Sequence, residues 1–169
     1  MTLALVLMQA VWSLINPCDV AAAAEQLHNP QVSYNPEYQT IEFPNGDIAE
    51  GQGVCTDVLV RAFRHLGVDL QVEIHRIMSE PKDPNIDHRR VPNIAKYLDE
   101  SVHWKVTSEP PQPGDVIWWK LPGNYLNHIG IVTSNGMVMH NIGRGQVADV
   151  RPDDYPRHRV YRLVHASHD

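Results

Sequence analysis

Four side chains in this sequence have the types and the order that nucleophilic catalysis requires. Cys55 is a candidate nucleophile, His128 is a candidate base, and His140 or Asn141 could orient that base. A cysteine nucleophile needs a base within hydrogen-bond distance, and the base needs a partner that holds its ring. Each residue alone has a simpler interpretation, since a free cysteine is often only a small buried hydrophobe. The combination in this order predicts acyl transfer through a thioester.

The first element that must position this chemistry is a helix that begins near Cys55. Between Gly53 and Gly67, apolar residues recur at helical spacing: Val54, Val58, Leu59, Ala62, Phe63 and Leu66. Gly67 suits the position just past a helix end, and Asp57 suits the first turn, where negative charge stabilises the helix dipole. Unpaired backbone N–H groups near Cys55 would lower its pKa. We therefore expect a reactive thiol in the first turn of a buried helix packed against a sheet.

The second element is a hairpin that carries both histidines. Residues 128–132 and 137–141 are β-prone and are separated by the turn sequence Ser134-Asn135-Gly136. A strict two-residue turn would place Gly130 opposite Asn141, whereas a three-residue loop with Gly136 left-handed would place Gly130 opposite His140. Because a shift of one residue exchanges the faces of a strand, these residues alone leave both registers open.

The remaining signals predict an α+β fold, with helices first and an antiparallel sheet after them. We expect a short helix at residues 21–27, capped by Asp19, and another at 93–98. Further strands are expected at 39–43, 116–121 and 159–164, while residues 68–78 fit either helix or strand. Residues 79–92 are rich in proline and charge. We expect Asp87 to order this loop by pairing with Arg89 or Arg90.

Length, composition and charge restrict the class of protein. A chain of 169 residues with 43% hydrophobic residues is most simply one folded domain, and we favour a monomer. A formal net charge of −6, without a basic run, argues against a nucleic-acid partner. Two cysteines make no disulfide framework, although a Cys18–Cys55 disulfide would compete with a free thiol.

The apolar N-terminus resembles a secretory signal peptide, although no Lys or Arg precedes its apolar run. We expect residues 1–17 to be a signal peptide and residues 18–169 to form a single domain, exported to the periplasm or cell envelope. The alternative is an N-terminal helix docked on the core. The apolar run is too short for a comfortable membrane span, so we expect no stable span.

Several motifs together resemble a known family: Gly-Val-Cys-Thr-Asp at 53–57, Asn-Ile-Asp-His-Arg-Arg-Val-Pro-Asn at 85–93, Pro-Gly-Asp at 113–115, His-Ile-Gly-Ile-Val at 128–132 and His-Asn-Ile-Gly at 140–143. They are similar to those of bacterial domain-of-unknown-function family 1287, an envelope family similar to the NlpC-type, papain-like cell-wall cysteine peptidases. The resemblance covers roughly residue 19 to the C-terminus. It implies a papain-like fold, with Cys55 as nucleophile, His128 as base and His140 as third member, and it favours the three-residue hairpin loop. It also implies an amidase or endopeptidase acting on peptidoglycan stem peptides.

Five further residues are candidates for substrate binding: Tyr34, Asp57, Asp87, Arg89 and Arg90. Tyr34 could donate a hydrogen bond to an oxyanion. Arg89 and Arg90 could hold a substrate carboxylate through two parallel hydrogen bonds.

Other functions are compatible with the same residues. One is a non-catalytic envelope binding module of the same fold, and another is an acyltransferase or thioesterase that uses the same triad. A metal site is a third, but structural zinc sites usually have four ligands at short spacings, which Cys55, His128 and His140 do not provide. We therefore expect no metal and no cofactor.

Overall fold

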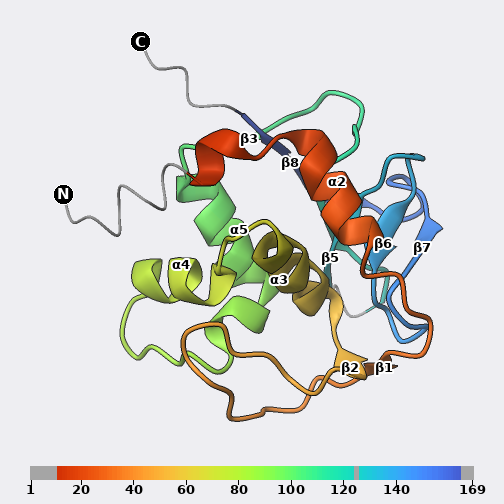
Figure 1. The fold of residues 1–169 in the computed structure, drawn as a ribbon. Helices are drawn as coiled ribbons and strands as arrows, with labels where there is room; N and C mark the ends of the chain where they lie inside the picture. The colour runs from red at the N-terminus through yellow and green to blue at the C-terminus, as the bar shows by residue number, and fades with distance from the viewer. Residues whose placement is uncertain (1–10, 124–125, 165–169) are drawn as a thin grey trace.

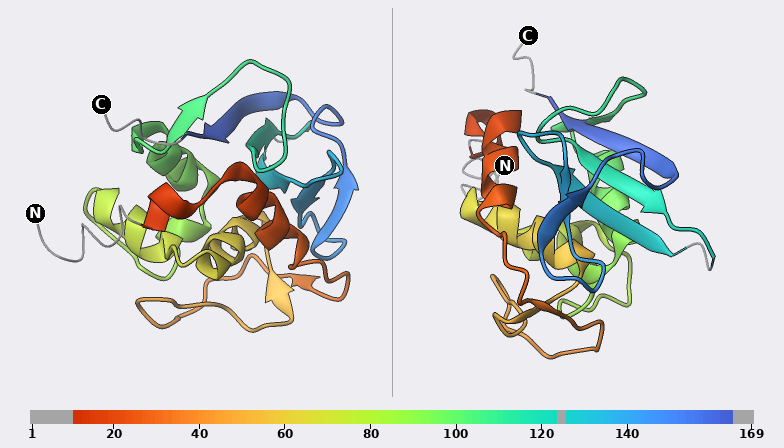
Figure 2. Two further views of the ribbon diagram at one scale, coloured as in Figure 1. Left: turned by 45° about the horizontal axis from the view of Figure 1, so that its top comes forward. Right: turned by 90° about the vertical axis from the view of Figure 1, so that its right-hand side faces the viewer.

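The computed structural model describes residues 11–123 and 126–164, in which a group of helices packs against an antiparallel sheet (Figures 1 and 2). The helices are α2 (Pro17–Glu25), α3 (Cys55–His65), α4 (Leu70–Ile77), the 3-10 helix η1 (Asp87–Arg89) and α5 (Val91–Glu100). The main-sheet strands are β3 (Trp104–Val106), β4 (Val116–Lys120), β5 (Asn127–Val132), β6 (Val138–His140), β7 (Val147–Val150) and β8 (Arg157–Leu163). The short strands β1 (Ser33–Tyr34) and β2 (Gln52–Gly53) pair in parallel. Helices therefore precede an antiparallel sheet, as the sequence predicted.

The main sheet has the strand order β3-β8-β4-β5-β6-β7, and every neighbouring pair is antiparallel. Side chains alternate between the two faces of each strand. Ile129 and Ile131 of β5 pack in the large core shared with the helices, whereas Val132 packs in a second cluster with Trp119 and Val160. Both faces of the central strands are therefore buried, which fixes the register of the strands that carry the histidines.

Helix α3 lies in the middle of the molecule, with α2 and α4 beside it and β5 packed against it (Figure 1). Every residue from Cys55 to Phe63 is buried. Gly67 follows the helix with a φ of +80°, a left-handed conformation that glycine adopts without steric cost. The prediction of a buried helix that begins at Cys55 and ends before Gly67 is confirmed.

Residues 39–43, expected as a strand, form none. The Ile41 N–H donates to Asn85 Oδ1 at 2.9 Å instead of to a neighbouring strand, and Glu42 and Phe43 are exposed. Alternating side chains alone do not make a strand when no partner edge is available. The undecided segment 68–78 contains α4, whose N-cap residue Asp69 accepts a hydrogen bond from the Gln71 N–H at 2.9 Å.

The first helix of the predicted set begins earlier than expected. Asn16 is the N-cap of α2, and Asp19 is the third helical residue, whose carboxylate accepts from the Asn16 N–H at 3.0 Å. This reciprocal arrangement is a capping box, which satisfies two N–H groups at the helix start. Strands β3 and β7 lie in segments where no strand was expected.

The described part of the N-terminal segment packs on the core. Residues 11–14 are helical, and Trp12 and Ile15 are each only 5% exposed. The Trp12 ring stacks on His103 with a centroid distance of 5.2 Å and meets Phe63 at 5.6 Å. In the part of the chain that the structure describes, no helix is long and apolar enough to cross a membrane. The other residues of the expected signal peptide, 1–10, lie outside the described residues.

Candidate functional site

Cys55 is the first residue of α3, which packs against β5. The Ile129 backbone N–H, which directly follows His128 in the chain, hydrogen-bonds the sulfur, as do the N–H groups of Cys55 and Thr56. Burial nevertheless raises the pKa of the Cys55 thiol to about 11, because desolvation outweighs these N–H groups. The expectation of a lowered thiol pKa is therefore wrong for this structure, in which the thiol is neutral at pH 7.

Neither cysteine forms a disulfide in the described residues, and Cys18 is exposed while Cys55 is buried. Among those residues, Cys55 Sγ and the His128 ring also form no direct hydrogen bond. Such bonds are often long in ligand-free structures and shorten when substrate binds. The Ile129 N–H at the sulfur belongs to the residue that directly follows His128, so the two residues are connected through the backbone of β5.

The hairpin has the register that places His140 on the face of His128. Ile131 pairs with Met139 and Val132 with Val138, so Gly130 lies opposite His140. Residues 134–136 form the loop, with a φ of +81° at Gly136. The three-residue loop is therefore confirmed.

Gly130 is what lets the two rings approach. A Cβ at this position would lie 2.6 Å from Val138 Cγ1 and 3.2 Å from the His140 Cβ. Any side chain at residue 130 would thus displace the strand that carries His140. The His128 Nε2 and the His140 Nδ1 are hydrogen-bonded at 2.7 Å, and both side chains are buried.

The hydrogen-bonded chain continues to a residue that the sequence analysis did not consider. The other ring nitrogen of His140, Nε2, lies 2.8 Å from Asp149 Oδ1, and Arg144 holds the second carboxylate oxygen, Oδ2, at 3.2 Å. Burial lowers the pKa of His140, and burial together with His140 lowers the pKa of His128 to about 3. Both rings are therefore neutral at pH 7, and His128 is available as a proton acceptor.

Asn141, the alternative third member, has a different position. It is fully buried, and its Nδ2 donates to the Gly53 carbonyl at 3.2 Å while its Oδ1 accepts from the Gly143 N–H at 2.9 Å. Asn141 therefore joins the end of β6 to the residues that precede Cys55. This contact fixes the start of α3 relative to the hairpin.

A buried ion pair holds the other side of the helix start. Arg89 Nε donates to Asp57 Oδ1 at 2.9 Å, and Asp57 Oδ2 accepts from the Val54 N–H at 2.7 Å. Arg89 also donates to the Asn35 carbonyl at 3.1 Å. Arg89 thus connects α3, η1 and the loop after β1.

The predicted pairing of Asp87 with Arg89 or Arg90 is wrong. Asp87 Oδ2 accepts from the Asp83 N–H at 2.8 Å and lies 3.8 Å from His75 Nδ1, while Arg90 is exposed. The loop is ordered as expected, but Arg89 points away from it toward α3. The cause is the Asp57 carboxylate. It is buried at the helix start, and a buried charge is costly unless a cation such as Arg89 pairs with it.

A cleft of about 490 Å³ opens next to the cysteine. Cys55, Tyr34, Arg89 and Arg90 line it, together with Val91, Pro92 and Asn93 at the start of α5. Tyr34 is 45% exposed, and its pKa is raised by burial and by the nearby Cys55 and Asp57. Three of the five candidate binding residues, Tyr34, Arg89 and Arg90, thus line this cleft, whereas Asp57 and Asp87 are buried and are not among the lining residues.

A family model described as "Domain of unknown function (DUF1287)" matches residues 20–163. The chain belongs to this family.

One relative of this DUF1287 chain is "Uncharacterized protein YijF" of Escherichia coli (strain K12), with 37% identity over 147 residues, 75% of this chain and 71% of that protein. Among solved structures, "Structure of NlpC2 from Trichomonas vaginalis" is similar, with a TM-score of 0.51 and 13% identity over 89% of this chain. The DUF1287 chain spans 50% of the length of that structure. The likeness shows an NlpC-like fold, as the sequence motifs implied.

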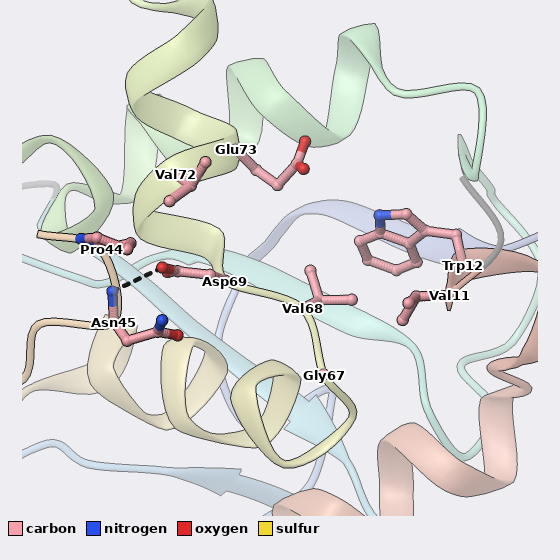
Figure 3. A pocket seen from close by; sticks show the side chains of 9 residues that line it. All are labelled: Val11, Trp12, Pro44, Asn45, Gly67, Val68, Asp69, Val72 and Glu73. Carbon is pink, nitrogen blue, oxygen red and sulfur yellow. Dashed lines mark hydrogen bonds between the residues drawn. The ribbon is translucent and has the colours of Figure 1, made fainter. Parts of the chain in front are cut away.

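A separate pocket of this DUF1287 chain lies elsewhere, between the N-terminal segment and the start of α4 (Figure 3). It has a volume of about 260 Å³, and apolar side chains such as Val11, Trp12 and Val68 share its wall with Asp69 and Glu73. The Asn45 N–H donates to Asp69 Oδ2 at 2.7 Å on one side of it (Figure 3). Neither Cys55 nor the two histidines line this pocket.

Asp149 was missed because its strand was missed. Its segment is only four residues long and follows the glycine-containing turn at Gly143 and Gly145. A single acid in a short strand is a weak signal. The signal that could have pointed to Asp149 was its position in the strand-rich half of the chain, downstream of His140.

Proposed function

We propose that this protein is a cysteine hydrolase, an amidase or endopeptidase, that cleaves amide bonds in peptidoglycan stem peptides. The observation that carries the proposal is the 2.7 Å hydrogen bond between His128 and His140. His128 lies on β5, and the N–H of the next residue in this strand, Ile129, contacts the Cys55 sulfur. Membership of the DUF1287 family and the NlpC-like fold support the reaction class. The envelope location and a monomeric state are parts of the same proposal.

In the proposed mechanism, the Cys55 proton moves to His128 Nδ1 as the sulfur attacks the amide carbonyl. The C–S bond forms, and the carbonyl oxygen becomes an oxyanion that backbone N–H groups at the start of α3 can stabilise. The C–N bond then breaks as His128 gives its proton to the leaving amine. Water, activated by His128, hydrolyses the thioester and restores the thiol.

The neutral resting state of both groups fits general-base catalysis better than a preformed ion pair. A thiol with a pKa of about 11 and an imidazole with a pKa of about 3 keep the proton on sulfur until substrate arrives. Proton transfer then becomes favourable only as the new C–S bond removes charge from sulfur. We assign the role of an oxyanion donor to Tyr34, which lines the same cleft.

The cleft suggests which part of an anionic peptide is recognised. Arg89 is engaged by Asp57, so its charge is already compensated. Arg90 lines the cleft and is exposed, and no carboxylate lies within ion-pair distance of it among the described residues. We therefore assign substrate carboxylate binding to Arg90 and a supporting role to Arg89. Stem peptides carry free carboxylates and would suit this cation.

The test is incubation of purified sacculi with the wild-type protein and with Cys55→Ala, followed by mass analysis of released fragments. We expect new amine and carboxylate ends with the wild type, and none with Cys55→Ala. Cys18→Ser is the matched control, because Cys18 is exposed and is not among the cleft-lining residues. Binding of sacculi without any cleavage would instead favour a binding module. Cleavage of thioesters with amides left intact would favour the thioesterase alternative.

A further inference from the structure

We propose that Asp149 is a positioning residue that sets which nitrogens of His140 and His128 carry protons, so that His128 keeps an unprotonated Nδ1 for Cys55. The inference rests on the proposed function and extends its machinery from three residues to four. It is carried by the unbroken chain from Asp149 Oδ1 to His140 Nε2 at 2.8 Å and from His140 Nδ1 to His128 Nε2 at 2.7 Å.

Asp149 lies at an irregularity in the pairing of β6 with β7. His140 pairs with Val147 and Met139 with Ala148, but Val138 pairs with Val150, so Asp149 is the extra residue of a β-bulge. Bulges often redirect a side chain next to a functional site. Strand β7 is the last strand of the sheet and lies beside β6 (Figure 1). His140 on β6 therefore contacts His128 on β5 through one ring nitrogen and Asp149 on β7 through the other.

The proton positions follow from the chemistry of each atom. An ionised carboxylate can only accept, so His140 Nε2 must carry the proton that lies between it and Asp149. A neutral His140 then has an unprotonated Nδ1, which must accept from His128 Nε2–H. A neutral His128 with its proton on Nε2 has an unprotonated Nδ1. The series Asp149, His140 and His128 therefore leaves the unprotonated nitrogen at His128 Nδ1, on the side of the ring away from His140.

Arg144 orients the Asp149 carboxylate. It holds Asp149 Oδ2 at 3.2 Å, so the carboxylate has one oxygen for the guanidinium and one for the ring. The groups that face His140 are therefore His128 from β5, Asp149 from β7 and, through Asp149, Arg144. Arg144 is exposed, and its contact orients the carboxylate without burying a second charge near the rings.

Asp149→Asn is the informative variant because Arg144 decides how the new amide lies. A guanidinium can only donate, so it draws the amide oxygen toward itself and turns the NH2 group toward His140 Nε2. The proton of His140 must then move to Nδ1, and that of His128 to its Nδ1. We expect kcat to fall about 10²- to 10⁴-fold with KM changed far less, as is typical when a base is held in the wrong tautomer.

The double variant Arg144→Ala/Asp149→Asn should recover part of this loss, because its amide is free to turn its oxygen back to His140. The matched control is Asp153→Asn, since Asp153 is an exposed aspartate that forms an ion pair with Arg157 at the start of β8. We expect that control to have wild-type kcat. Rescue by the double variant is not expected if Asp149 serves stability alone.

The decisive readout is independent of turnover: long-range ¹H–¹⁵N spectra of the histidine rings. In the wild type, we expect His140 to be protonated at Nε2 and unprotonated at Nδ1, with the reverse in Asp149→Asn. A wild-type His140 protonated at Nδ1, or an Asp149→Asn variant with unchanged tautomers and kcat, would overturn the inference. If the tautomers change as expected but the wild type cleaves no amide, the positioning role stands and the proposed function fails.

Discussion

Burial sets the resting state of the Cys55–His128 pair, and this has a measurable consequence. With a thiol pKa of about 11, only a small thiolate fraction exists at pH 7, and it grows tenfold for each pH unit. Alkylation of Cys55 by iodoacetamide should therefore accelerate about tenfold per unit between pH 7 and pH 10. The measurement uses the Cys18→Ser background, so that Cys55 is the single reactive site. A flat rate from pH 5 to 8 would reveal a preformed thiolate–imidazolium pair instead.

His140 and Asn141 are adjacent in the chain but should respond differently to replacement. His140→Ala removes the partner of His128 Nε2 and should lower turnover by about two to four orders of magnitude. Asn141→Ala removes the hydrogen bond to the Gly53 carbonyl and should act mainly by lowering the melting temperature. Turnover and melting temperature are measured for both variants. A nearly normal rate for His140→Ala, with a folded but inactive Asn141→Ala, would contradict the assignment.

Among the elements, the start of α3 depends on the buried pair Asp57–Arg89, whose side chains are only 3% and 2% exposed. Arg89→Ala would leave a buried carboxylate without its cation, and we expect the free energy of unfolding to fall by about 3–5 kcal/mol. Denaturant unfolding measures this loss. Arg90→Ala is the matched control, because its side chain is exposed, and it should change stability by less than about 0.5 kcal/mol. Equal losses for both variants would show that the pair is not what holds the helix start.

How far the sequence predicts this site depends on the range of the contacts involved. The start of α3 follows from a local signal, the apolar stripe along the helix. The residues of the turn left the hairpin register open, and only the resemblance to a known family favoured the three-residue loop at Gly136. The partner of Arg89 could not be predicted, because Asp57 is 32 residues away and meets it only through folding. Asp149 was missed for a similar reason: the bulge that presents it belongs to the pairing of β6 with β7, not to its own sequence.

At the scale of the whole molecule, buried neutral histidines should make the fold sensitive to acid. Burial lowers the pKa of His88 to about 4 and that of His128 to about 3, below the ordinary value near 6.5. Their contribution to stability is complete above about pH 6.5 and is lost as pH falls toward 4, because the unfolded chain takes up protons that the folded chain does not.

Replacing His88 by leucine tests this loss. It should reduce the pH dependence of the unfolding free energy between pH 6 and pH 4 by up to about 1.4 kcal/mol per pH unit. Thermal or denaturant unfolding at several pH values gives the slope, with the exposed His65→Gln as control. An unchanged slope in His88→Leu would mean that other groups cause the acid sensitivity.

The N-terminal segment connects stability to the expected export of the protein. Trp12 is 5% exposed and contacts Phe63, His103 and Trp104, so Trp12→Ala should lower the free energy of unfolding by about 3–5 kcal/mol. Leu14→Ala is the control, because Leu14 is 80% exposed and its truncation should cost less than about 0.5 kcal/mol. Removal of residues 1–17 would delete both Trp12 and Ile15 from the core. We therefore expect a form that begins at Cys18 to have a lower melting temperature than the full chain. A product beginning at Cys18 with an unchanged melting temperature would show that this packing does not stabilise the folded domain.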